Sequence, residues 1–358
     1  MKTKNSKSPT SLTARDSLRQ LSALARELAE KGRYREAAAT IEHLFATPRL
    51  QGECSAALLD EARDLFTTCQ RELLEQNHPA AVQAAAELLI ETEKLAARPI
   101  RVAIEDDANE SGVQLAWNHG CDHHLVVCQR EPEKLQPYKL ASALLRIQSE
   151  SEALLAGKSR FPTVSRQQID NLLSLFDPLE AQRLVAQEGL WITLNPHPDE
   201  IALVPLNLLL ASAIFMLIDA RLRLRYSVLR PAQFLARSTA FHEAWKANED
   251  RTTVPPSQRI RERTLNALDG LHGLFLDSLF GGVTDFALRY NNVDGFDLAQ
   301  ALWRRWQSRF PAMEPGDEFA LLDEFAEILG LSGSFSWTTV PFAAVGKPKP
   351  QSDEAAGL

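Results

Sequence analysis

The side chains best suited to binding a metal ion are concentrated in residues 118–124, which read NHGCDHH. Thiolates and imidazoles are the ligands that zinc prefers. Adjacent residues of a strand point to opposite faces, so His123 and His124 cannot both face one ion there, whereas a turn around Gly120 could bring several ligands together. A metal site and a polar turn with one histidine packed on a sheet are both compatible with this segment. The candidate ligands are His119, Cys121, His123 and His124.

A second set of chemically capable residues falls on a helix that we expect to begin at Pro137 and to end at Gly157. Arg146 stays charged at any ordinary pH and pairs readily with a carboxylate. Glu150 offers that carboxylate one helical turn away, and Asp219 offers one from a later helix. Alternatively, Arg146 and Glu150 lie on a solvated helix face.

The elements around this helix resemble those of the zincin metallopeptidases. The segment HHLVVCQREPEKLQPYKLASALLRIQSESEALLAGKSRF predicts a strand, a loop and then a long helix. In zincins such a helix carries H-E-x-x-H, whose histidines bind Zn²⁺ and whose glutamate acts as base. The corresponding positions here are Ser142, Ala143 and Arg146. The later segment LIDARLRLRYSVLRPAQFL resembles the helix that supplies a third, acidic ligand, which makes Asp219 its counterpart. The resemblance spans residues 100–245.

The departures from the zincin pattern imply a scaffold without metal, cofactor or catalytic residue. Ser142 is a poor zinc ligand, Ala143 cannot accept a proton, and Arg146 would repel a metal ion. We therefore expect an ion pair between Arg146 and Asp219 to fill the space of the lost zinc. Such a protein is a pseudoenzyme.

The N-terminal region, 13–98, is expected to be helical throughout. The run LARELAEKGRYREAAATIEHLF resembles a tetratricopeptide helical hairpin, with small residues where two helices approach closely. A second hairpin is expected between Leu58 and Ala97, turning at Pro79. The residues that carry the resemblance are Leu24, Ala25, Gly32, Tyr34 and Ala37.

The predicted fold class is mainly α with a small β-sheet (α+β). Short β-branched runs predict strands, and the residues beyond 137 predict a long series of helices. A zincin-like body is expected over 99–337, between the helical region and a disordered tail at 338–358, with another disordered tail at 1–12. The predicted strands are 100–105, 113–117 and 124–129, and the later helices are 165–176, 178–188, 205–226, 231–246, 257–280, 284–290, 296–309 and 317–329.

Composition narrows the classes of function. The 358 residues carry a net charge of −8, which argues against a broad nucleic-acid interface. The N-terminus lacks the apolar stretch of a secretory signal. The four cysteines do not make a disulfide framework and are expected to remain thiols in the cytoplasm. Residues 201–218 contain no charge and predict either a buried core helix or a membrane span.

Three hypotheses follow. The favoured one is a non-catalytic interaction protein that binds an unknown protein partner, with residues 13–98 as the binding region. The second is a zinc-dependent hydrolase whose ligands are His119, His123 and His124 with an acidic residue, Asp219 or Glu200. The third is a membrane-associated protein that uses 201–218.

Overall fold

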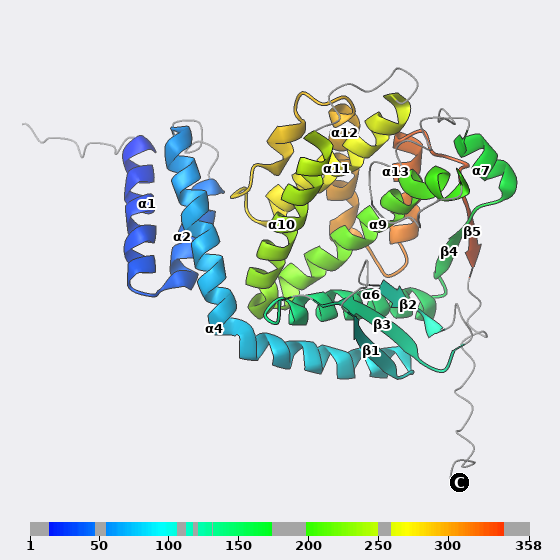
Figure 1. Cartoon of the computed structure of the whole chain (residues 1–358), viewed down its shortest axis with the longest axis horizontal. Coiled ribbons are helices and arrows are strands. Elements are labelled where there is room, and N and C mark those ends of the chain that lie inside the picture. The colour runs from blue at the N-terminus through cyan, green and yellow to red at the C-terminus, as the bar shows by residue number, and fades with distance from the viewer. Residues whose placement is uncertain are drawn as a thin grey trace, which may run out of the picture.

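The chain is mainly helical with two small β-sheets, as the sequence predicts (Figure 1). The computed structural model describes residues 14–46, 55–105, 112–116, 121–130, 132–173, 198–249 and 259–339. The long helices pack side by side, and the three-stranded sheet lies against α6 at one side of them.

The first two helices form the predicted helical hairpin. Helix α1 (Ala14–Glu30) and α2 (Tyr34–Phe45) are joined at Gly32, whose φ of +71° closes the turn. Ala25 and Ala37 are completely buried where the helices meet, because their small side chains let the two backbones approach.

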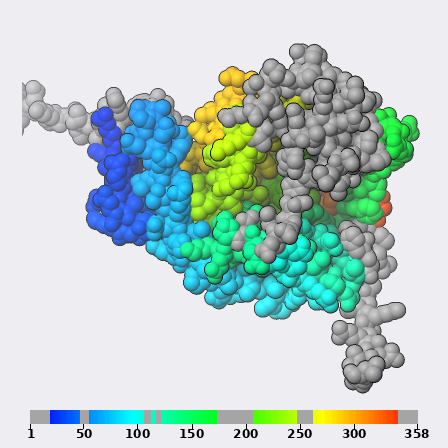
Figure 2. All heavy atoms as spheres, in the orientation of Figure 1, coloured from blue at the N-terminus to red at the C-terminus, as the bar shows by residue number. Residues whose placement is uncertain are grey.

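The second predicted hairpin is wrong, because one long helix, α4 (Ala56–Ala96), runs through the expected turn with Pro79 inside it. Proline removes the hydrogen bond to the carbonyl four residues earlier and bends a helix without having to end it. The first part of α4 packs beside α2, and the second part turns to run under α6 (Figure 1). Figure 2 shows α1 and the first part of α4 at one end of the molecule.

The central sheet has the order β1-β3-β2. Strands β1 (Ile100–Glu105) and β3 (His124–Gln129) have the predicted bounds and pair in parallel, while β2 (Gly112–Gln114) pairs antiparallel with β3. One sheet face packs on α6 (Gln136–Leu155), which has nearly the predicted bounds.

Most of the remaining described helices agree with the predicted ones to within a few residues, but α9 begins seven residues before its predicted start, and η1 and η4 have no predicted counterpart. The predicted helix 178–188 lies outside the described residues. The helices are α7 (Arg166–Leu173), α9 (Pro198–Arg225), η1 (Ser227–Leu229), α10 (Arg230–Glu249), α11 (Arg259–Leu279), η3 (Phe286–Tyr290), α12 (Phe296–Arg309), η4 (Phe310–Ala312) and α13 (Glu318–Ile328).

A second, two-stranded sheet has no counterpart in the sequence prediction. Strand β4 (Arg160–Thr163) pairs antiparallel with β5 (Ser336–Thr339). Strand β5 therefore extends two residues into the segment predicted to be a disordered tail. Trp337 anchors this strand, since its indole N–H donates to Asp323.

Helix α9 is the centre of the body. Leu209 and Met216 on one side are completely buried in the larger core, and Leu222 is completely buried in the smaller core beside α6 and the sheet. The uncharged stretch 201–218 thus belongs to a helix that packs against several others, although Leu208 and Phe215 are exposed. Within the described residues, no helix meets the length and apolarity needed to cross a membrane.

Candidate functional site

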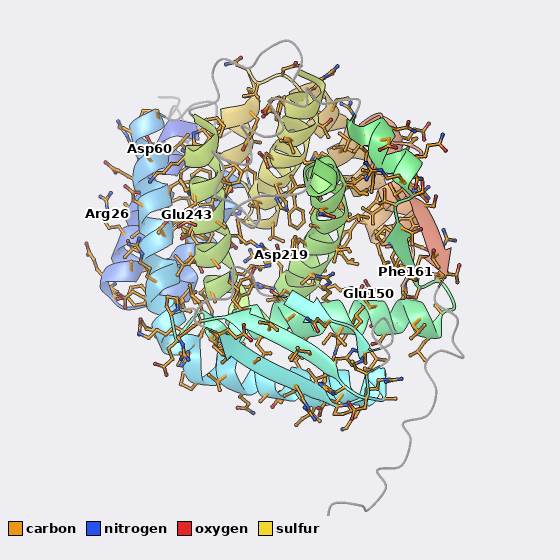
Figure 3. The ribbon with its side chains drawn as sticks, turned by 45° about the vertical axis from the view of Figure 1, so that its right-hand side comes forward. Arg26, Asp60, Glu150, Phe161, Asp219 and Glu243 are labelled. Atoms are coloured by element: carbon orange, nitrogen blue, oxygen red, sulfur yellow. The ribbon has the colours of Figure 1, made fainter. Side chains whose placement is uncertain are left out.

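A row of polar side chains follows one face of α6. Tyr138, Ser142, Arg146 and Glu150 are spaced four residues apart, so each lies about one turn beyond the previous one. The Tyr138 hydroxyl at the start of the row contacts Asp219 of α9, and Figure 3 shows Glu150 on the side of α6 that faces the helical body. The three positions predicted from the zincin resemblance, Ser142, Ala143 and Arg146, lie along this part of α6.

Asp219 of α9 is the centre of a buried polar cluster. Only 1% of the residue is exposed. Its Oδ1 accepts hydrogen bonds from the Tyr138 hydroxyl at 3.2 Å and from Gln233 Nε2 at 3.1 Å. Its Oδ2 lies 2.7 Å from Nε of Arg237. The cluster therefore joins α6, α9 and α10 through one carboxylate.

Arg237 on α10 supplies the positive charge that balances Asp219. Its Nε–H is not aligned with the Oδ2 atom, so the 2.7 Å contact is an ion pair rather than a well-directed hydrogen bond. The guanidinium also lies 5.4 Å from the centre of the Phe215 ring, a cation–π contact. Burial alone would lower the pKa of Arg237, but the Asp219 carboxylate raises it above its ordinary value.

Two further titratable groups beside the pair stay neutral near pH 7. Burial raises the pKa of Tyr138 above its ordinary value. Burial and, to a smaller extent, the charge of Arg237 lower the pKa of His272 on α11 to about 4, while the Asp219 carboxylate opposes this change. Asp219 and Arg237 thus form an ion pair in this cluster, and their charges neutralise one another.

Several buried polar atoms around the pair lack a hydrogen-bond partner within the described residues. Ser142 Oγ, Gln233 Oε1, Arg146 Nε and Ser238 Oγ belong to this group. Unsatisfied buried groups cost free energy, so their concentration at one place distinguishes this interior from the apolar cores on either side.

The predicted ion pair between Arg146 and Asp219 is wrong. Within the described residues, the partner of Asp219 is Arg237, and Arg146 lies beside Glu150. Burial raises the pKa of Glu150 to about 7, the charge of Arg146 opposes this rise, and the Glu318 carboxylate adds to it. This face is only partly solvated, because Arg146 and Glu150 are half-buried and the Nε atom of Arg146 is buried. Arg146 interacts with Glu150 because the two residues are four positions, or about one turn, apart on the same face of α6.

The histidine-rich segment is not brought together as a metal site in its described part. His124 is completely buried, and its Nδ1 accepts the N–H of Ala116 at 3.2 Å. His123 instead contacts Asp122, and Cys121 is exposed. Burial lowers the pKa of His124 to about 4. His119 and the side chain of Glu200 lie outside the described residues, and among those described no three potential ligands converge.

The cluster at Asp219 is a buried ion pair with hydrogen bonds from neighbouring helices, and it does not offer the ligands of a zinc site. A zinc site requires lone pairs from several neutral or anionic ligands. Here a guanidinium already holds the Asp219 carboxylate, and the adjoining α6 positions Ser142, Ala143 and Arg146 offer a hydroxyl, a methyl group and a second guanidinium.

Sequence reasoning missed Arg237 and Tyr138, although α10 carries a usable signal. Arg237 follows Phe234 by three residues and precedes Phe241 by four, and both phenylalanines are buried. An arginine on the apolar face of a helix requires a buried anion. Asp219, which directly follows the uncharged stretch 201–218 of α9, is the matching signal.

Three comparisons with known proteins gave no match: no family model, no curated protein and no solved structure matches the chain.

Proposed function

We propose that this protein is a non-catalytic binding protein, in which a zincin-like body without metal carries a tetratricopeptide-like helical arm. The proposal rests on the polar cluster at Asp219. The carboxylate that a metal would need is neutralised by Arg237, and Arg146 and Ala143 stand where the resemblance would require a ligand and a base. Such an arrangement supports a role in recognition, and we infer that the protein acts in the cytoplasm.

The arm supports a binding role through its shape and surface. Helices α1 and α2 with the first part of α4 form a helical layer at one end of the molecule (Figure 2). Phe66 of α4 packs edge-on against Phe234 of α10, with ring centres 5.0 Å apart, so the arm is attached to the body. Leu24 on α1 is 45% exposed, and an exposed apolar side chain on a helical array suits contact with a partner peptide or helix.

Zinc content tests the proposal. The full chain is incubated with zinc, passed through a desalting column and measured by mass spectrometry for zinc per chain. We expect far less than one zinc per chain, with no difference between the wild type and Asp219→Asn. One zinc per chain that is lost in Asp219→Asn would overturn the proposal, because it would show that Asp219 is a metal ligand.

A second variant tests whether the histidine-rich segment, rather than Asp219, binds zinc. If zinc is bound in the wild type and in Asp219→Asn but lost when His123 and His124 are both replaced by alanine, the hydrolase hypothesis gains its ligand set and the non-catalytic proposal fails. Urea unfolding of each variant separates loss of metal from loss of structure.

A further inference from the structure

Strand β1 leaves one edge of the central sheet open. Hydrogen bonds from His124 N–H to Pro99 O and from Arg130 N–H to Glu105 O show that the odd-numbered residues of β1 direct their backbone groups toward β3. The backbone groups of the even-numbered residues therefore point away from β3. One of them, the N–H of Ile100, is satisfied by Glu93 Oε1 at 2.9 Å.

The next two even-numbered residues, Val102 and Ile104, have no such partner within the described residues. Each directs one N–H and one C=O outward from the edge. Such an edge is a template for a further strand, and proteins usually protect it with a charge, a proline or a covering element.

The side chains at this edge are apolar and exposed. Val102 is 38% exposed and Ile104 46% exposed. They lie on the same sheet face as Val126 and Cys128, which are completely buried. The apolar face of the sheet thus extends beyond the helices that cover it.

Helix α4 adds more exposed apolar surface. In Figure 1 β1 lies near the C-terminal end of α4, from which it follows along the chain. Val82 and Ile90, two turns apart on α4, are 48% and 54% exposed. Four of the large exposed apolar side chains of the described chain thus come from β1 and the adjoining part of α4.

The sequence of β1, IRVAIE, is self-complementary when two copies run antiparallel about a twofold axis at Ala103. Val102 then opposes Ile104 of the second copy, and Arg101 opposes Glu105. Both copies direct the backbone groups of Val102 and Ile104 at one another, which makes four N–H···O=C bonds. Arg101 and Glu105 are exposed, and each faces an opposite charge at a closely spaced position.

We propose that two copies of this chain associate through β1, which joins their two three-stranded sheets into one continuous sheet. We choose a second copy as the occupant of the open edge because the twofold axis places Arg101 of each copy opposite Glu105 of the other. An isologous contact of this kind closes on itself and stops at a dimer.

Charge reversal at β1 tests the proposal in solution. The molar mass of the full chain is measured by sedimentation equilibrium over a range of concentrations for the wild type, Arg101→Glu, Glu105→Arg and the double variant. We expect each single reversal to weaken the dimer by about tenfold or more, since it creates two like-charge contacts, and the double reversal to restore the wild-type constant. Arg26→Glu, an exposed reversal on α1, is the control and should leave the dimer unchanged.

Val102→Pro tests the backbone contact. Proline removes an N–H that faces solvent in a single chain, a substitution that edge strands tolerate. This variant should therefore become monomeric and should melt at the same temperature as the wild type measured at a concentration at which the wild type is dissociated. A wild type that is monomeric at every concentration would overturn the proposal, as would a dimer that survives Val102→Pro or a double reversal that restores nothing.

Discussion

Loss of Arg237 provides the sharpest test of how the buried cluster is held together. In Arg237→Met the carboxylate of Asp219 stays buried at 1% exposure and keeps its hydrogen bonds from Tyr138 and Gln233, but it loses the ion pair at 2.7 Å. Removing one partner of a buried pair costs about 3–5 kcal/mol. The two remaining hydrogen bonds place the expected loss at the lower end, about 3 kcal/mol.

The partner substitution shows whether the loss comes from the unpaired charge. Asn at position 219 removes the charge and keeps an oxygen that can accept from Tyr138 and Gln233. The double variant Asp219→Asn/Arg237→Met should therefore lose only about 1 kcal/mol, about 2 kcal/mol less than Arg237→Met alone.

Urea unfolding followed by circular dichroism measures these differences, with an unchanged dependence on urea as the sign that the unfolding transition is the same. Arg26→Met, which removes an exposed ion pair with Glu61, serves as the control and should change the free energy of unfolding by less than about 1 kcal/mol. A loss below about 1 kcal/mol in Arg237→Met, or a double variant as unstable as the sum of the single ones, would refute the reasoning.

Three further predictions concern pH and backbone. The pKa of His124 is about 4 in the folded state and about 6.5 in the unfolded state. The stability that neutral His124 contributes is therefore complete above pH 6.5 and is lost as the pH falls toward 4, by up to about 3 kcal/mol. His124→Asn should flatten this part of the curve of unfolding free energy against pH, and an unchanged slope would contradict this prediction. Glu150 has the opposite sign, because its folded pKa of about 7 lies above its unfolded value, so stability falls as the pH rises from about 4.5 to 7. Glu150→Gln should consequently raise the free energy of unfolding at pH 8 by about 1–2 kcal/mol, allowing for partial exposure, and a loss of stability there would count against the account. Gly295→Ala should lower the free energy of unfolding by about 3 kcal/mol or more, since φ is +102° and the new Cβ would lie 2.3 Å from the Arg263 carbonyl oxygen. Gly330→Ala, at φ +72° in open space, should lower it by about 1 kcal/mol. Equal melting temperatures of the two variants would disprove the steric argument.

The elements with strong local signals could be predicted from the sequence. The β-branched runs at Ile100–Glu105 and His124–Gln129 gave both strands with their bounds, and Gly32 marked the turn between α1 and α2. Strands β4 and β5 could not be found this way, because each is four residues long and pairs with a segment far along the chain. Pro79 misled the prediction, since packing of α4 on both sides of it outweighs the local loss of one hydrogen bond.

The candidate site was predicted in part. Asp219 was recognised as a residue that needs a partner, and α6 as the helix beside it, but the partner came from α10. Pairing across helices depends on how they pack, which periodicity does not specify, whereas the partner of Arg146 follows from the four-residue spacing to Glu150. The open edge of β1 required the hydrogen-bond register, which no sequence pattern reports.

The central claim is that Arg237 holds the Asp219 carboxylate where a metal would bind, and the melting temperature of the full chain measured with excess chelator and with excess zinc tests it most directly. A ligand that binds the folded state raises the melting temperature, so the account predicts the same melting temperature in both conditions for the wild type and for Asp219→Asn. A rise of several degrees with zinc in the wild type that disappears in Asp219→Asn would contradict it.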